Sequence, residues 1–137
     1  MSLRRLTAPA ALAGLLISGP AFAHHSFAMF DRGEGKERTI SGTLKAFDFV
    51  APHGWIKLAV FEGAGPPVTW SFEMASVGQL QKLGWTPDSV KTGEKVTVVY
   101  YPVKFGSYGG QFIQLVLPDG RTLNGLAEPD RGFPTGR

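Results

Sequence analysis

The sequence predicts a mainly β fold, a small five-stranded barrel with one short helix between strands three and four. Five segments alternate apolar and polar residues with the period of two expected of half-buried strands. Between the third and the fourth of these segments, the spacing of apolar residues changes to that of a helix. Turns rich in glycine and proline separate the segments, as short connections between strands require.

The first strand is expected over residues 39–49, with Ile40, Leu44 and Ala46 on one face. Gly42 lies on the same face inside this strand. A glycine within a strand often marks a sharp bend or a bulge. A strand shared by both halves of a small barrel needs such a bend, so Gly42 supports the barrel prediction.

The second and third strands are expected over residues 55–62 and 68–74, which both alternate. Residues 51–54 form the turn into the second strand. Residues 63–67 contain two glycines and two prolines, which exclude regular structure and return the chain to the third strand. The first three strands therefore form an antiparallel meander.

A short helix should follow the third strand. Ser76 and Gln79 have the spacing of a capping box, and Leu80 and Leu83 share one helical face. Gly84 is placed to end the helix, because glycine readily adopts the left-handed conformation found after a helix. We expect about two helical turns.

The fourth and fifth strands are expected over residues 95–101 and 111–117. A turn at residues 118–121 allows residues 122–123 to add a short hairpin arm. Three strands, a helix and two strands follow one another in the order of the OB-fold, a five-stranded, partly open barrel. A β-sandwich would lack the helix in the middle of the chain, and a lipocalin-like barrel would need more strands.

Residues 1–23 have the features of a cleavable secretion signal. They carry two arginines near the start, an apolar run over residues 8–17, and Ala21-Phe22-Ala23, the small-x-small pattern of a cleavage site. The run is shorter than the roughly 20 residues that a helix needs to cross a bilayer. We therefore expect a periplasmic or secreted protein without a transmembrane segment after signal cleavage.

The mature chain should form a single domain. Residues 24–37 show no sustained period and are expected to form an extended N-terminal arm. Residues 38–124 should form the barrel, and residues 125–137, interrupted by glycine and proline, a flexible C-terminal tail. Of the 137 residues, 114 remain after cleavage, a length that suits one modest core.

The composition excludes several functions. Removing the two signal arginines leaves 12 basic residues against 11 acidic ones, so the mature chain lacks the charge expected of a nucleic-acid-binding protein. The chain has no cysteine, which excludes disulfides and thiol chemistry. It also has no Gly-x-Ser-x-Gly, His-Glu-x-x-His or phosphate-loop motif, so we expect no catalytic role.

The three histidines lie at positions where they could bind a metal. His24 and His25 follow the expected cleavage site, and His53 lies in the turn of the first hairpin. In a meander the first turn and the end of the third strand lie at the same pole, so Glu73 should be near His53. An α-amine and imidazole nitrogens suit Cu(II) or Zn(II), which predicts a metal site formed by these residues. The alternative is that the terminal histidines extend into solvent and His53 only covers the turn.

Four aromatic side chains are expected to point outward from strands one and two: Phe47, Phe49, Trp55 and Phe61. This is the face that OB-folds often use for ligands, which suggests a stacking surface for a small ligand or a partner protein. The structural alternative is that the arm covers this face, because its Phe27, Met29 and Phe30 also need apolar surface to pack against.

Several motifs together resemble a known family. They are His24-His25-Ser26-Phe27, Gly42-Thr43-Leu44, Pro52-His53-Gly54-Trp55-Ile56, Gly84-Trp85-Thr86, Gly93-Glu94-Lys95-Val96-Thr97-Val98 and Leu117-Pro118-Asp119-Gly120-Arg121. The combination resembles the exported bacterial family catalogued as domain of unknown function 6152. The resemblance implies export, a domain from His24 to about residue 123, and two recurring histidine motifs. It implies no reaction.

These observations favour an exported, non-catalytic binding or accessory protein that binds copper or zinc through its N-terminal histidines. One alternative is a metal-independent module that holds an unidentified periplasmic partner or a small ligand on the aromatic face. Another alternative is a small metal-dependent oxidase, which would need a concave pocket beside an open metal position.

Overall fold

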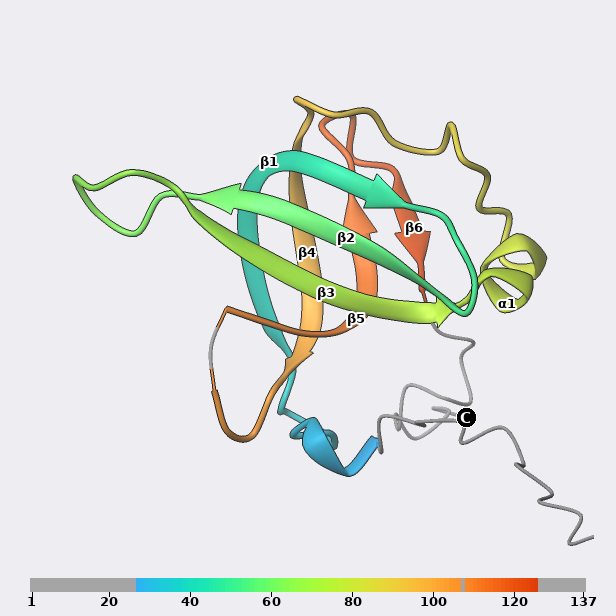
Figure 1. Ribbon diagram of the computed structural model, residues 1–137, viewed down its shortest axis with the longest axis horizontal. Coiled ribbons are helices and arrows are strands. Elements are labelled where there is room, and N and C mark those ends of the chain that lie inside the picture. The colour runs from blue at the N-terminus through green and yellow to red at the C-terminus, as the bar shows by residue number, and fades with distance from the viewer. Residues whose placement is uncertain (1–26, 107, 126–137) are drawn as a thin grey trace, which may run out of the picture.

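A computed structural model of the protein describes residues 27–106 and 108–125 (Figure 1). The elements in chain order are η1 (Phe27–Met29), β1 (Arg38–Asp48), β2 (His53–Val60), β3 (Val68–Ser76), α1 (Val77–Lys82), β4 (Lys95–Pro102), β5 (Gly109–Val116) and β6 (Thr122–Asn124). The predicted order of three strands, a helix and two strands is confirmed. The predicted signal at residues 1–23 and nearly all of the predicted tail lie outside the described residues.

The strands close into a mixed five-stranded barrel. The sheet order is β3-β2-β1-β4-β5-β6, and an additional parallel pairing of β3 with β5 joins the two halves into a ring. The other neighbours pair antiparallel. This arrangement confirms the OB-fold-like barrel. β6 is the expected short hairpin arm, which pairs with the later part of β5.

A bend in β1 allows the barrel to close. The strand pairs with β4 up to Thr43 and with β2 from Thr43 onward, and Figure 1 shows its strong curvature. A β-carbon at Gly42 would lie only 2.8 Å from the carbonyl oxygen of Ala59. The close approach requires glycine, as its position in the sequence indicated.

A bulge at Lys45 changes which side chains of β1 face the core. Leu44 pairs with Leu58, whereas Ala46 pairs with Lys57, so Lys45 is an extra residue in the ladder. The structure therefore differs from the expected alternation: Ala46 lies opposite an outward residue, and Phe47 lies opposite the buried Ile56. Both Phe47 and Phe49 pack against the main core.

The helix covers the end of the barrel where β2 begins and β3 ends. The predicted capping box is present: the Ser76 hydroxyl accepts from the Gln79 amide at 3.3 Å, and the Gln79 side chain accepts from the Ser76 amide. Leu80 is fully buried in the core. After the helix, Trp85 enters the same core and its indole N–H donates to the carbonyl oxygen of Asn124 at 2.7 Å.

The described part of the N-terminal arm is more structured than its sequence suggested. η1 forms a 3-10 turn, and Phe30 then makes a β-bridge with Val103 at the end of β4. The Phe30 side chain is buried with Tyr101 and Ile113 in a second apolar cluster on the outside of the barrel. Among the described helices, none has the length and apolar character needed to cross a membrane.

Candidate functional site

The His53 imidazole and the Glu73 carboxylate form a close pair on the outer face of the barrel. His53 begins β2, and a bulge between His53 and Trp55 lets both residues lie beside Glu73 on β3. The His53 Nδ1 lies 2.5 Å from the Glu73 Oε1. The prediction that Glu73 lies near His53 is confirmed.

The two members of the pair differ in exposure. The Glu73 side chain is only 10% exposed, whereas the His53 side chain is 39% exposed. Because an ionised carboxylate only accepts hydrogen bonds, the Nδ1 of His53 is the donor in this contact, and its Nε2 is the ring nitrogen that does not face Glu73. A carboxylate that orients an imidazole in this way is a common arrangement behind metal-binding histidines.

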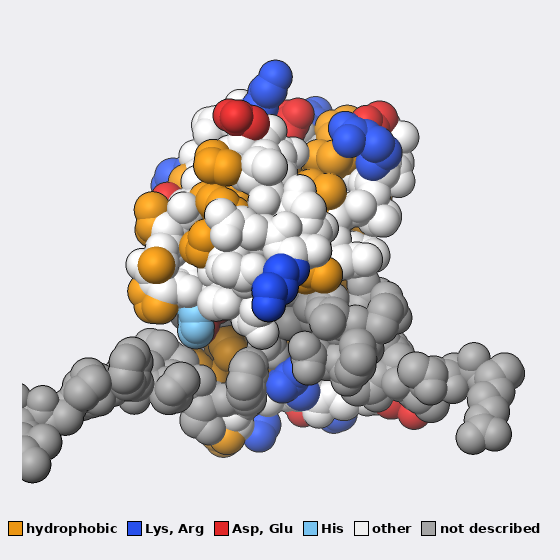
Figure 2. Space-filling view, turned by 90° about the vertical axis from the view of Figure 1, so that its right-hand side faces the viewer, with side chains coloured by type: hydrophobic (Ala, Val, Ile, Leu, Met, Phe, Trp, Pro, Cys, Tyr) orange, Lys and Arg blue, Asp and Glu red, His pale blue; other side chains and the backbone are white. Residues whose placement is uncertain are grey.

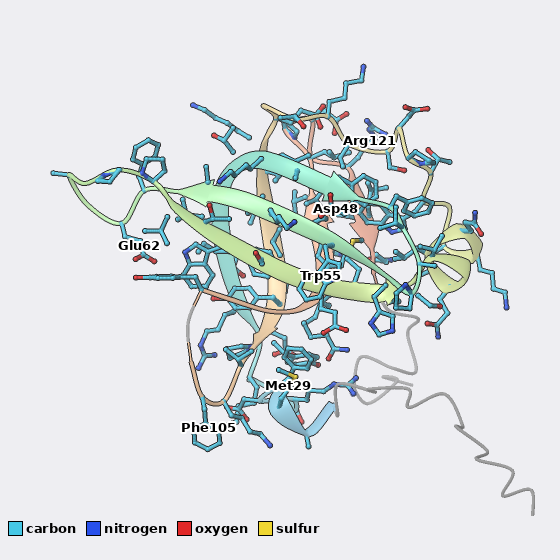
Figure 3. All side chains as sticks on the ribbon, viewed as in Figure 1. Met29, Asp48, Trp55, Glu62, Phe105 and Arg121 are labelled. Atoms are coloured by element: carbon cyan, nitrogen blue, oxygen red, sulfur yellow. The ribbon has the colours of Figure 1, made fainter. Side chains whose placement is uncertain are left out.

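A pocket of about 170 Å³ lies beside this pair. Trp55 and Glu73 line it from the barrel, Met29 and Phe30 line it from the arm, and Val103 and Tyr108 line it from the segment between β4 and β5. Figure 3 labels Met29 on η1 and Trp55 on β2, which both line the pocket.

Strand register explains how a carboxylate comes to lie in this pocket. On β3, Phe72 and Met74 belong to the core, so the intervening Glu73 points outward. Glu73 lies directly opposite Gln111 in the parallel pairing with β5. Gln111 is only 5% exposed, and its Oε1 has no hydrogen-bond partner among the residues that the structure describes.

Sequence reasoning missed Tyr108 as part of this site. Its one signal was the neighbouring Gly109-Gly110, because paired glycines before a strand often indicate close backbone approach. A β-carbon at Gly110 would overlap the carbonyl oxygen of Tyr101. The glycines therefore allow β5 to approach its neighbours so closely.

The four predicted aromatic residues do not form one surface. Phe47 lies against both Phe49 and Trp85, with ring centroids 5.5 Å apart in each case. Phe61 follows β2 and is 69% exposed. Of the four, Trp55 is the residue that lines the pocket, together with Met29 and Phe30 of the arm.

The structure describes only two of the four residues predicted to bind a metal, His53 and Glu73. His24 and His25 lie outside the described residues. Within residues 27–106 and 108–125, no group of three or more potential ligands is close enough to hold a metal ion. Figure 2 shows the imidazole of the described histidine at the surface, beside hydrophobic side chains. A metal site here would need at least one ligand besides His53 and Glu73.

Comparison with known proteins gave one family. The model of the Family of unknown function (DUF6152) matches residues 13–112, which is more than half of the chain. No curated protein and no solved structure matches the chain.

Proposed function

The chain belongs to the DUF6152 family, and from this premise we propose that it is an exported, non-catalytic binding or accessory protein that binds one Cu(II) ion, or less tightly Zn(II). The ligands are His24, through its α-amine and imidazole, and His53. The observation that carries this proposal is the half-exposed His53 imidazole held by the buried Glu73 carboxylate.

The pair supports metal binding through its orientation. The Glu73 carboxylate fixes the ring and the proton of His53, which leaves the Nε2 lone pair as the donor to a metal. Such a carboxylate also raises the basicity of the imidazole toward the metal. Copper(II) is the preferred ion because it leads the affinity order of the divalent metals at nitrogen sites.

The position of the arm supports the participation of the N-terminus. Met29 lines the same pocket as Glu73, so the arm passes close to the pair. The six residues from His24 to Met29 are joined by five Cα–Cα steps and can span about 17 Å when extended. Cleavage after Ala23 would give His24 a free α-amine in addition to its imidazole, and hence two nitrogen donors in one residue.

Titration calorimetry on the tagless mature protein tests this proposal. We expect one Cu(II) per chain, with binding at least about tenfold weaker when methionine precedes His24 or when His53 is replaced by alanine, since each change removes a nitrogen donor. Binding should also weaken as the pH falls, because protons compete for the same nitrogens. Copper affinity no greater than that of an unstructured His-His peptide would refute the proposal.

A further inference from the structure

We infer that the pocket beside Glu73 binds a small organic cation, a primary ammonium group on a short apolar body. This inference goes beyond the proposed metal function and does not depend on it. The metal would bind at the exposed Nε2 of His53, whereas the ammonium group would bind on the pocket side of Glu73.

The charge of Glu73 is the first argument. Glu73 lines the pocket with a side chain that is only 10% exposed, and burying a carboxylate is costly unless it is paired. In the described part of the chain no lysine or arginine pairs with Glu73, and its partner is the half-exposed His53 imidazole, whose Nδ1 lies 2.5 Å from Oε1. An ammonium ion in the pocket would place a positive charge on the other side of this carboxylate.

The hydrogen-bonding character of the carboxylate is the second argument. An ionised carboxylate only accepts hydrogen bonds, so a ligand that pairs with Glu73 has to bring donors. A primary ammonium group carries three donors, whereas a quaternary ammonium group carries none, so the carboxylate favours a primary amine.

The walls of the pocket suit the remainder of such a ligand. Trp55, Tyr108 and Phe30 supply aromatic rings, and aromatic faces attract cations within about 6 Å. Tyr108 is held in place by Trp70, with ring centroids 5.5 Å apart. A ligand anion would instead be repelled by the Glu73 carboxylate.

The volume of the pocket limits the size of the ligand. It measures about 170 Å³. An apolar protein cavity of about 150 Å³ is large enough to bind benzene. A single ring or a short alkyl chain bearing an aminomethyl group therefore matches the space, and benzylamine is a suitable probe.

Calorimetry or ligand-observed NMR with two matched probes tests the inference. Benzylamine and benzyl alcohol have nearly the same shape, but only the amine is cationic at neutral pH. On the mature protein, we expect benzylamine to bind at least about tenfold more tightly, because only it can pair with the buried carboxylate. Glu73→Gln should remove this preference, and Trp55→Ala should weaken benzylamine binding. Phe61→Ala, which changes an exposed ring outside the pocket, should leave the affinity unchanged.

Equal affinities of the two probes for the unmodified protein, or no benzylamine binding at millimolar concentration, would overturn the inference. Both outcomes are measured without a variant, so they do not depend on whether Glu73→Gln folds. Adding methionine before His24 separates this site from the metal site. It should weaken copper binding at least about tenfold and leave benzylamine affinity unchanged.

Discussion

At the scale of single residues, the His53–Glu73 pair contributes to folding as well as to the proposed site. His53→Ala would leave the Glu73 carboxylate buried without its hydrogen-bond donor. We expect the free energy of unfolding to fall by about 1–3 kcal/mol, the usual cost of an unsatisfied buried group. Urea denaturation at neutral pH measures this change.

Glu73→Gln provides the matched control for that prediction. The glutamine side chain still offers a carbonyl oxygen to the Nδ1–H of His53 but carries no charge to desolvate. The free energy of unfolding of Glu73→Gln should therefore be closer to that of the unmodified protein than the free energy of unfolding of His53→Ala is. A larger loss for Glu73→Gln than for His53→Ala would contradict this account of the pair.

Ionisation of the Tyr100 phenol should make the stability of the protein depend on pH in the alkaline range. Burial raises the pKa of the Tyr100 phenol, and the nearby positive charge of Arg38 partly opposes this shift. As the pH rises past the ordinary tyrosine value of about 10, the unfolded chain loses this proton first. The stabilisation is thus complete below that value and is lost as the pH rises through the higher pKa of the folded state.

Tyr100→Phe removes this titration. Melting temperatures of the two proteins between neutral pH and about pH 11 measure the effect, because groups common to both proteins cancel in the difference. We expect a constant difference up to about pH 10, beyond which the unmodified protein loses stability relative to the variant. A difference that stays constant to the highest pH would show that burial does not perturb Tyr100.

Sequence reasoning located the His53–Glu73 pair but not the environment of Phe47 and Phe49. The pair follows from strand direction, which survives small errors in register. The facing of Phe47 and Phe49 depends on whether an extra residue is inserted before them, because one inserted residue exchanges the two faces of a strand. The Lys45 bulge is such an insertion, and no glycine or proline at that position indicates it in the sequence.

At the scale of the elements, barrel closure depends on Gly110. This residue lies in β5 between β4 and β3, and an added β-carbon would overlap the Tyr101 carbonyl oxygen and lie 2.7 Å from the Tyr100 ring. The neighbouring strand can relieve this overlap only by moving away. We expect Gly110→Ala to cost at least about 3 kcal/mol, at the upper end of overpacking effects.

Chemical denaturation and amide exchange measure the effect of this substitution. Faster exchange should be concentrated in the pairing of β4 with β5, where the strands separate. Gly65→Ala is the control, because a β-carbon at Gly65 would meet no atom within 4 Å. Equal stabilities of the two variants would show that close approach at Gly110 is not required for closure.

The strands, the helix and the capping box could be predicted because each depends on local spacing. The packing of the arm could not. Phe30 belongs to no periodic segment, and its partners Tyr101 and Ile113 lie far along the chain on the outer faces of β4 and β5. Outward apolar residues on a strand do not indicate which segment covers them.

At the scale of the whole molecule, the folded unit begins before the first strand. The interior core and the outer cluster of Phe30, Tyr101 and Ile113 share β4 and β5. The backbone reinforces this attachment, since the Asp31 amide donates to the Pro102 carbonyl at 2.8 Å and the Lys104 amide donates to the Met29 carbonyl at 2.9 Å. The barrel therefore includes part of the segment expected to be an extended arm.

Phe30→Ala tests whether this second cluster contributes to global stability. Removing a buried phenylalanine typically costs about 3–5 kcal/mol, which is a large part of the roughly 5–15 kcal/mol that stabilises a small domain. Because each kcal/mol lowers the melting temperature of a domain near 100 residues by about 4–8 °C, the expected decrease exceeds about 10 °C. Met29→Ala, which removes a partly exposed side chain from the same arm, should lower the melting temperature far less.

If the melting temperature of Phe30→Ala matched that of the unmodified protein, the arm would contribute nothing to the stability of the barrel. If it falls as expected, benzylamine affinity should fall with it, because Phe30 is also a wall of the pocket.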